Sequence, residues 1–395
     1  MNKAVLLFSI AVLSSASNYD DIIESMHAFK NEETKNIELN HNQNTELIKK
    51  NAQYYSKISD EATAYYQDFL SKKWGEKNVK LSNISTFTQY NENMDARQSA
   101  DFENGIVTIE VVLDEEQKIT PQYFDEILKN FSKQSLSEAI KKDPINSLES
   151  KFMESKLIVT SYQKQDDSKL LDGYIEYKKT TPDDIKYKKV ILKNGESKFI
   201  YYVDIKMVPD HLKKRALKFK PYVLTKAREY GVKPSTIFAI IQTESYFNPL
   251  AKSHIPAYGL MQIVPTTAGV DSYYALTKNK KLLSPKYLYN ANNNIEIGSK
   301  YVQIIQDQYL KGITNPISKS YCISTSYNAG IGSLIYSFTG SKRKRAEAID
   351  IINSMTPDEV YTHLSTSSRL TDEAKHYVKN IKLRSENYKI WDTEV

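Results

Sequence analysis

The sequence of 395 residues contains a single cysteine, Cys322, and this scarcity excludes two features. A lone thiol cannot form a disulfide within the chain. No cysteine follows the apolar run near the N-terminus, so a lipid-accepting cysteine, and with it a lipoprotein anchor, is not supported. No nearby histidine would activate the Cys322 thiol, and we therefore expect a small core residue rather than a nucleophile.

Long apolar segments are also scarce. Apart from residues 4–13, no stretch is long and apolar enough to span a bilayer. That run follows Lys3 and ends in the small residues Ser14, Ser15 and Ala16, an arrangement typical of a secretory signal peptide with its cleavage site. We therefore expect residues 1–16 to be a signal peptide and the protein to be exported. The alternative is an ordinary buried N-terminal helix.

Charge is unevenly distributed along the chain. Residues 209–395 contain 26 Lys and Arg against 15 Asp and Glu, whereas residues 1–208 contain 28 against 33. A basic surface suits a polyanionic partner, such as the carboxylate-bearing peptides of a cell wall or anionic lipid. The basic run 342–345 resembles a nucleic-acid patch, but a solvated loop face is the better interpretation, and no nucleic-acid partner is expected.

The pattern of the sequence changes along the chain and predicts an α+β fold overall. Residues 17–74 are polar and read as a helical lead-in. In residues 75–208, alternating segments at 105–113 and 199–207 flank a helical stretch at 122–140, which indicates an α+β N-terminal domain. From 209 to 395 the pattern is nearly all helical and is punctuated by glycine and proline, as expected for a mainly α-helical domain.

One acidic residue, Glu244, occupies a position where a charge is costly. Isoleucines stand three, four and seven residues before it, so the acid continues the apolar stripe of a helix that opens at Pro234, with Ser235 as its expected N-cap. A carboxyl group in an apolar wall keeps its proton to higher pH than in water, as a general acid near neutrality requires. The same pattern also fits a structural glutamate satisfied by a partner.

Three further clusters follow Glu244: Gly-Leu-Met-Gln at 259–262, Tyr-Asn-Ala-Gly at 327–330 and Ala-Lys-His-Tyr-Val at 374–378. Singly they read as a turn, a helix C-terminus closed by Gly330 and a helical stripe. Together, in this order, they resemble the signatures of family 1 lytic transglycosylases, which cleave murein glycan strands and have a lysozyme-like fold. The resemblance makes residues 209–395 a lysozyme-like transglycosylase (SLT) domain. Segments such as 102–110 and 353–361 resemble the membrane-bound lytic murein transglycosylase C group, which extends the similarity to the N-terminal domain.

The resemblance assigns roles position by position. Glu244 matches the family's single catalytic acid and base, and Tyr377 matches a tyrosine whose hydroxyl orients that acid. Other positions match residues that bind or polarise the saccharide: Ser253, Met261, Gln262, Tyr327 and Asn328. This chain departs from the family between residues 253 and 259, where Pro-Ala-Tyr replaces a turn of small residues.

The reaction implied by the resemblance needs one carboxylate. As an acid it protonates the glycosidic oxygen that leaves N-acetylmuramic acid, and as a base it takes the proton of that sugar's 6-hydroxyl, which closes a 1,6-anhydro ring. No water and no second carboxylate are required. No cofactor is implied, and the six histidines form no zinc-binding His-Glu-x-x-His pair. The expected partner is peptidoglycan in the periplasm, with peripheral contact to the outer membrane or other cell-wall proteins.

Two other functions stay open on the sequence alone. One is a lysozyme-type murein hydrolase in which Asp271 holds the attacking water. The other is a catalytically silent wall-binding protein, in which the turn at 256–258 blocks the saccharide groove.

Overall fold

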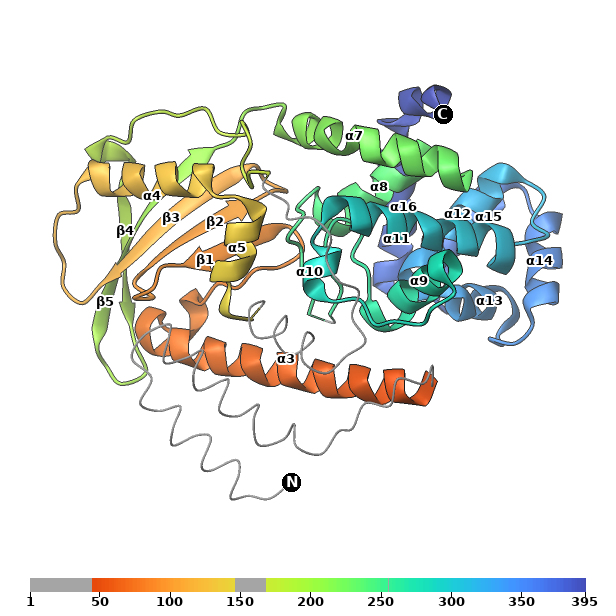
Figure 1. Ribbon diagram of the computed structural model, residues 1–395, viewed down its shortest axis with the longest axis horizontal. Coiled ribbons are helices and arrows are strands. Elements are labelled where there is room, and N and C mark those ends of the chain that lie inside the picture. The colour runs from red at the N-terminus through yellow and green to blue at the C-terminus, as the bar shows by residue number, and fades with distance from the viewer. Residues whose placement is uncertain (1–44, 146–167, 255) are drawn as a thin grey trace, which may run out of the picture. The chain divides into compact units, whose positions relative to one another are not determined.

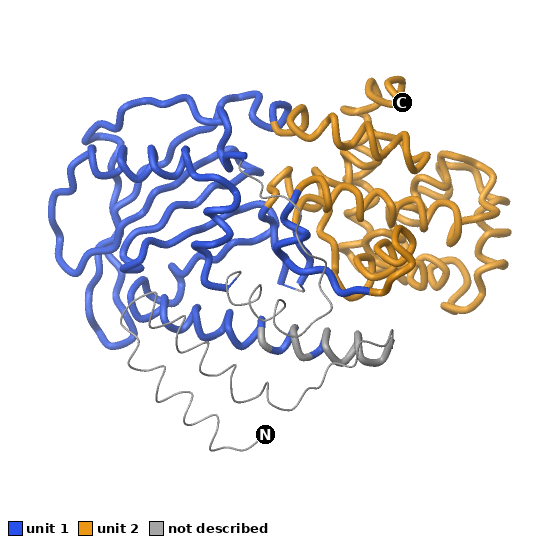
Figure 2. Tube along the Cα trace, in the orientation of Figure 1, with its two compact units in different colours: residues 1–214, 250–258, 281–290 blue, residues 215–249, 259–280, 291–395 orange. Residues whose placement is uncertain are grey.

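The computed structural model describes residues 45–145, 168–254 and 256–395, so the expected signal peptide at 1–16 lies outside the described residues (Figure 1). The chain divides into two compact units, shown in different colours in Figure 2. Unit 1 comprises residues 1–214, 250–258 and 281–290, and unit 2 comprises residues 215–249, 259–280 and 291–395. Each unit has a buried apolar core of its own.

The centre of unit 1 is a five-stranded antiparallel sheet with the strand order β1-β2-β3-β5-β4. The strands are β1 (Thr86–Tyr90), β2 (Ala96–Asp101), β3 (Ile106–Leu113), β4 (Lys186–Ile191) and β5 (Ser197–Lys206). The strands predicted at 105–113 and 199–207 are β3 and β5, which pair with each other. The helical elements are α3 (Thr45–Trp74), η2 (Glu76–Asn78), α4 (Pro121–Lys133), α5 (Leu136–Lys142), η3 (Pro182–Asp184) and α10 (Pro285–Leu288).

Helices α4 and α5 contact one face of this sheet. Helix α4 packs against β2 and β3, and the ring of Phe131 stacks on Phe87 of β1. The helical stretch predicted at 122–140 is confirmed, and it consists of two helices, α4 and α5. Ser135 accepts the backbone N–H of Glu138 while the Glu138 carboxylate accepts the N–H of Ser135, and this capping box begins α5 directly after the Gln134 C-cap of α4.

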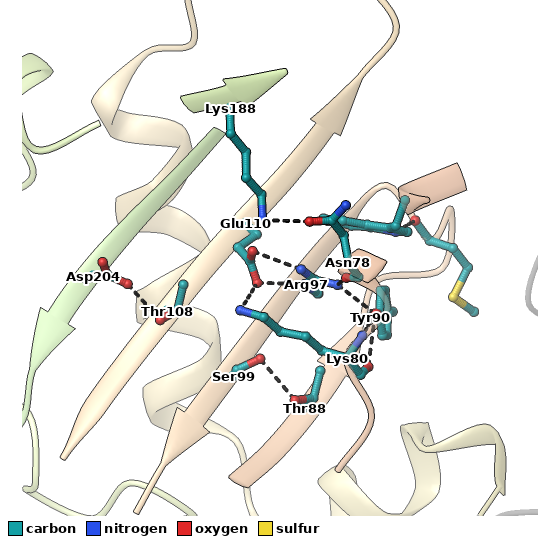
Figure 3. Close-up of polar contacts among 12 residues, drawn as sticks. Asn78, Lys80, Thr88, Tyr90, Arg97, Ser99, Thr108, Glu110, Lys188 and Asp204 are labelled. Carbon is teal, nitrogen blue, oxygen red and sulfur yellow. Dashed lines mark hydrogen bonds and ion pairs between the residues drawn. The ribbon is translucent and has the colours of Figure 1, made fainter. Parts of the chain in front are cut away.

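The opposite face of the sheet contains a buried ion pair (Figure 3). Arg97 on β2 and Glu110 on β3 are register partners, with exposed fractions of 1% and 3%. Arg97 donates to both Glu110 carboxylate oxygens at 2.7 and 2.8 Å, and Lys80 donates to one of them at 2.8 Å. The guanidinium also lies 4.1 Å from the Trp74 ring centroid and donates to the Tyr90 hydroxyl at 2.9 Å. Unit 1 thus buries a carboxylate whose charge is matched.

The environment of Glu110 favours its ionised form. Burial raises the pKa of this carboxyl, but the hydrogen bonds and the charge of Arg97, together with those of Lys80, outweigh burial and hold the pKa below its usual value. Because both carboxylate oxygens accept charge-assisted bonds, Glu110 has a structural role in holding β2, β3 and the segment before β1 together.

Unit 2 is mainly helical and includes all but the first residues of α7 (His211–Tyr230). Its centre is α8, which packs against α16 and η6, while α12 packs against α13, α15 and α16. The elements are α8 (Pro234–Ser245), η4 (Pro265–Gly269), α9 (Val270–Thr277), α11 (Ala291–Ile304), η5 (Ile305–Tyr309), α12 (Pro316–Ala329), α13 (Ile331–Thr339), α14 (Arg345–Ser354), α15 (Pro357–Thr366), α16 (Asp372–Glu386) and η6 (Lys389–Glu394). The predicted fold class, an N-terminal α+β part followed by a mainly helical part, is confirmed.

The core of unit 2 agrees with the apolar pattern of the sequence. The three isoleucines of the α8 stripe are fully buried, and so is Cys322 on α12, the expected small core residue. Burial raises the pKa of the Cys322 thiol well above its usual range, which keeps it protonated and unreactive. Among the helices of the described residues, none combines the length and apolarity needed to cross a membrane.

The start of α8 differs from the prediction. Helix α7 ends at Tyr230, and the next residue, Gly231, has a φ of 64°, in the left-handed region that glycine tolerates. The expected N-cap Ser235 is wrong, because Pro234 takes the first helical position and the cap falls on Lys233, which makes no side-chain capping bond. The Asp392 carboxylate in η6 instead accepts the N–H and the hydroxyl of Ser235, both at 2.8 Å. An acidic group thus caps the helix from far along the chain.

Candidate active site

Glu244 lies in the last turn of α8, on the stripe of the buried isoleucines. The helix ends at Tyr246, a C-cap residue in the left-handed conformation with φ 50° and ψ 34°. The Glu244 residue keeps part of its surface accessible. Burial raises the pKa of its carboxyl to about 7, the hydrogen bond from Tyr377 lowers this pKa, and the charge of Glu373 raises it. Near neutral pH the carboxyl can therefore both donate and accept a proton.

Tyr377 is the direct partner of Glu244. Its hydroxyl donates to Glu244 Oε1 at 2.7 Å, and its side chain is buried. Burial, and then the charge of Glu244, raises the pKa of Tyr377 well above its usual value, so the hydroxyl keeps its proton and remains a donor. Tyr377 lies on the first half of α16, which Thr371 caps by accepting the N–H of Ala374. The structure brings these two predicted residues together.

The turn at 259–262 is tied to two helices. The Tyr327 hydroxyl on α12 donates to the Met261 carbonyl at 2.7 Å, and the Met261 N–H donates to Asn294 Oδ1 on α11 at 2.7 Å. A Cβ atom at Gly298 would come within 2.3 Å of Met261 Sδ, so α11 needs glycine at this close approach. Met261 is fully buried and Gln262 nearly so. The Met261 side chain therefore lies inside the domain, while its backbone holds Tyr327.

Tyr327 is also close enough to Glu244 for the carboxylate charge to affect the pKa of the tyrosine. Burial, then the Glu244 carboxylate, raises the pKa of Tyr327 well above its usual value. Its ring lies 5.6 Å from that of Tyr301, centroid to centroid, in an edge-on arrangement. Two tyrosines that retain their protons, Tyr327 and Tyr377, therefore flank the glutamate.

Glu373 is a residue of this site that the sequence reasoning missed. The Asn328 side-chain amide donates to Glu373 Oε1 at 3.1 Å, and the charge of Glu373 acts on Glu244. A second carboxylate therefore lies close enough to Glu244 to affect its pKa, and the prediction that the reaction needs only one carboxylate stays a prediction. Glu373 precedes Tyr377 by four residues, which places both on one face of α16, and that spacing was the available signal. Asp271, the acid singled out for a hydrolase, lies exposed on α9 and does not contribute to the pKa shift of Glu244.

Ser253 belongs to a different unit from the other predicted residues. It lies in the loop 250–258 of unit 1, where its N–H donates to the Ala257 carbonyl and its hydroxyl accepts the Ala257 N–H, each at 3.2 Å. The neighbouring Tyr258 is fully buried, with its ring edge-on to Tyr289. Ser253 and Tyr289 line a cavity of about 500 Å³ within unit 1. The role of Ser253 toward Glu244 stays a prediction.

The arrangement in unit 2 is suited to proton transfer. Glu244 supplies a carboxyl that titrates near neutrality, Tyr377 fixes one of its oxygens, and the second oxygen, Oε2, has no hydrogen-bond donor within the described part of unit 2. In residues 45–145, 168–254 and 256–395, no group of three or more His, Cys, Asp or Glu is placed to hold a metal ion.

The known proteins that are similar to this chain include lytic transglycosylases. The Transglycosylase SLT domain family matches residues 221–349, and the N-terminal domain family of membrane-bound lytic murein transglycosylase C matches residues 41–129. Membrane-bound lytic murein transglycosylase C of Klebsiella pneumoniae (strain 342) is 31% identical over 80% of this chain and 85% of the relative. The protein of the same name from Actinobacillus pleuropneumoniae serotype 5b is 31% identical over 83% of this chain and 87% of the relative. The protein of the same name from Serratia proteamaculans is 43% identical over 48% of this chain and 52% of the relative.

Proposed function

Because this chain belongs to the membrane-bound lytic murein transglycosylase C family, we propose that it is an exported peptidoglycan lytic transglycosylase with Glu244 as its single general acid and base. The proposed reaction cleaves the β-1,4 bond between N-acetylmuramic acid and N-acetylglucosamine and leaves a 1,6-anhydro end. One observation carries the assignment: a glutamate carboxyl with a pKa of about 7 lies 2.7 Å from a tyrosine hydroxyl in the family's domain.

In the first step Glu244 acts as an acid. Its protonated carboxyl donates to the glycosidic oxygen as the C1–O bond of N-acetylmuramic acid breaks, and the departing sugar takes that proton as its hydroxyl. Positive charge develops at C1 and is met by the oxygen of the substrate's own acetamido group. Tyr377 holds one Glu244 oxygen throughout, which leaves the other oxygen to face the scissile bond.

In the second step Glu244 acts as a base. Its carboxylate takes the proton of the 6-hydroxyl on the same sugar, and the resulting oxygen forms a bond to C1 that closes the anhydro ring. The carboxyl regains the proton it gave away, so the cycle balances without water. A pKa of about 7 suits both steps, because neither form of the carboxyl is strongly favoured at neutral pH.

The other predicted residues of unit 2 support saccharide binding around this carboxyl. Asn328 presents an amide that Glu373 orients at 3.1 Å, and Tyr327 is fixed through the Met261 carbonyl. Amide and hydroxyl groups held in this way suit the acetamido and hydroxyl groups of amino sugars. Gln262 is the last residue of the same turn, and its side-chain amide donates to the Gly259 carbonyl at 3.0 Å.

The position of Glu373 near Glu244 is a specific observation in favour of the hydrolase alternative. A second carboxylate that acts on Glu244 is the kind of group that could hold a nucleophilic water, although Glu373 already accepts the Asn328 amide. Product analysis separates the two reactions. Mass spectrometry of digested murein is expected to show 1,6-anhydro ends, and reducing ends in their place would establish the hydrolase.

Replacing Glu244 tests the acid and base directly. Glu244→Gln keeps the shape of the side chain but cannot transfer a proton, and we expect murein solubilisation to fall by about 10³-fold or more. Sedimentation of the variant with insoluble murein should be unchanged, because binding does not need the proton. Undiminished lysis would refute the assignment, and equally low lysis by the wild-type protein would favour a wall-binding protein without catalysis.

The site of action follows from the same proposal. The murein substrate lies outside the cytoplasmic membrane, and the N-terminal sequence pattern of residues 1–16 fits export. We therefore place the protein in the periplasm, with peripheral contact to the outer membrane or to other cell-wall proteins as a further expectation.

A further inference from the structure

Helix α8, which contains Glu244, is held at both ends by the last segment of the chain. At its N-terminus the Asp392 carboxylate takes the place of the missing side-chain cap. At its C-terminus Arg384 of α16 binds the final turn. The negative group meets the positive end of the helix dipole and the positive group meets the negative end, so both contacts are electrostatically favourable.

Arg384 contacts the two residues that bracket the glutamate. Its Nη1 donates to the Gln242 carbonyl and its Nη2 donates to the Tyr246 hydroxyl, both at 3.0 Å. The guanidinium carbon also lies 4.8 Å from the centroid of the Tyr246 ring. The Gln242 carbonyl accepts the Tyr246 N–H as well, at 3.2 Å, which is the bond that closes the helix. Tyr388 donates to the Gln242 side chain at 2.7 Å.

These contacts lie on the same helix that orients the carboxyl. Tyr377 and Arg384 are seven residues apart on α16, which places them on one face about two turns from each other. That face therefore binds α8 at two points: Tyr377 holds the Glu244 side chain, and Arg384 holds the backbone two residues before it. Tyr246 is a non-glycine residue in the left-handed conformation, which costs free energy, and Arg384 holds its side chain through the hydroxyl.

We propose that Arg384 is a positioning residue for the reaction: it fixes the last turn of α8 so that the Glu244 carboxyl stays under the Tyr377 hydroxyl. The inference rests on the proposed function. Arg384 is half-buried and acts through α8 rather than on the substrate.

Two groups shift the pKa of Glu244, and both lie on α16: the Tyr377 hydroxyl lowers it and the Glu373 carboxylate raises it. Tyr327 on α12 is affected in turn, because the charge of Glu244 raises the pKa of Tyr327. Arg384 does not contribute to the pKa shift of Glu244, so any effect of its removal on that pKa must pass through geometry. The Tyr377 hydrogen bond lowers the pKa of Glu244, and its loss therefore raises this pKa.

The test is the pH dependence of kcat on purified murein for Arg384→Ala, Tyr377→Phe and the double variant. We expect Arg384→Ala to lower kcat about 10- to 100-fold with KM within about twofold, because a carboxyl misplaced by about 1 Å loses catalytic efficiency without losing substrate contacts. The alkaline limb of the profile should move to higher pH, as in Tyr377→Phe. The double variant should show no further movement, because both changes remove the same hydrogen bond.

Two variants separate positioning from a general loss of stability. Arg384→Lys keeps one donor and should recover part of kcat and part of the shift. Asp392→Asn weakens the cap at the opposite end of α8, and should lower Tm without moving the alkaline limb.

An alkaline limb that stays in place in Arg384→Ala, an unchanged kcat, or a shift that adds to that of Tyr377→Phe would each overturn the inference. These outcomes are read against a wild-type protein that forms anhydro ends. If the wild-type protein forms none, the proposed function itself fails, whatever the Arg384 variants show.

Discussion

Each unit of this protein contains a glutamate that is fully or partly buried, and the pKa values of the two carboxyl groups are shifted in opposite directions. Glu110 in unit 1 is held by Arg97 and Lys80, and its pKa lies below the usual value despite burial. Glu244 in unit 2 has a tyrosine hydroxyl for a partner and a second carboxylate nearby, and burial raises its pKa to about 7. Burial alone therefore does not make a general acid. The absence of a cationic partner decides it.

The comparison also distinguishes two roles of a carboxyl group that is removed from water: a structural role for Glu110 and proton transfer for Glu244. The charge of Glu110 is neutralised by a bidentate guanidinium bond, which fixes the register of two strands and leaves no capacity for chemistry. Glu244 is fixed through one oxygen only, by a neutral donor. Positioning without neutralisation leaves its proton exchangeable near neutral pH.

The largest expected effect in this comparison comes from removing Arg97. In Arg97→Met the Glu110 carboxylate is left buried without its guanidinium, and we expect unit 1 to lose about 3–5 kcal/mol of unfolding free energy. The chain has two tryptophans, Trp74 beside Arg97 in unit 1 and Trp391 in unit 2. Guanidinium unfolding followed by fluorescence of single-tryptophan variants therefore reports each unit separately.

The matched control for Arg97→Met replaces both charges. The variant Arg97→Met with Glu110→Leu leaves no buried charge unpaired, and it should recover most of the lost stability. A single variant as stable as the wild-type protein would show that the pair is not what holds β2 and β3 in register.

The two carboxyl groups should give the two units opposite pH dependences of stability. The folded pKa of Glu244 is raised from 4.5 to about 7, so the stability it contributes is present below pH 4.5 and is lost as the pH rises through 7, by up to about 3 kcal/mol. The folded pKa of Glu110 is lowered, so its contribution is present above the unfolded pKa and is lost as the pH falls through the folded pKa.

Urea unfolding between pH 3 and 8, read from the two tryptophan signals, measures both slopes. Glu244→Gln should remove the decrease in the stability of unit 2 between about pH 4.5 and 7. Glu110→Gln should remove the loss of stability of unit 1 at acidic pH. Slopes of the same sign in both units would contradict the comparison.

The smallest expected effect concerns Glu373. Its charge raises the pKa of Glu244, so Glu373→Gln should lower that pKa and move the alkaline limb of kcat to lower pH. At pH 7 we expect a rate about two- to fivefold below that of the wild-type protein. Asp271→Asn serves as the control and should leave the limb in place. Complete loss of activity in Glu373→Gln, with reducing ends as the wild-type product, would instead identify Glu373 as the base of a hydrolase.

The features that could be predicted from the sequence are those that depend on a pattern of a few neighbouring residues. The isoleucine stripe before Glu244 identified a buried acid, and the alternating segments identified β3 and β5. A local signal was overlooked once: Ser135 and Glu138 form a capping box, which begins a second helix within the helical stretch predicted at 122–140.

The features that could not be predicted depend on partners far apart in the chain. Asp392 caps α8 at Ser235, and Arg384 binds its final turn, across more than a hundred residues in each case. Nothing in the local pattern at Ser235 shows that its hydroxyl donates to a later carboxylate rather than accepting an N–H of its own helix. The Arg97–Glu110 pair likewise needs the register of β2 and β3, which follows from sheet assembly.

The dual capping of α8 has a consequence for the order of biosynthesis. Residues are added from the N-terminus, so a growing chain contains Glu244 long before it contains Arg384 or Asp392. Until Asp392 has left the ribosome, the helix lacks its acidic cap. Until Arg384 has left the ribosome, the helix lacks the bonds from this arginine to Gln242 and Tyr246. The last turn around the glutamate is therefore completed only once Arg384, 140 residues further along the chain, is available.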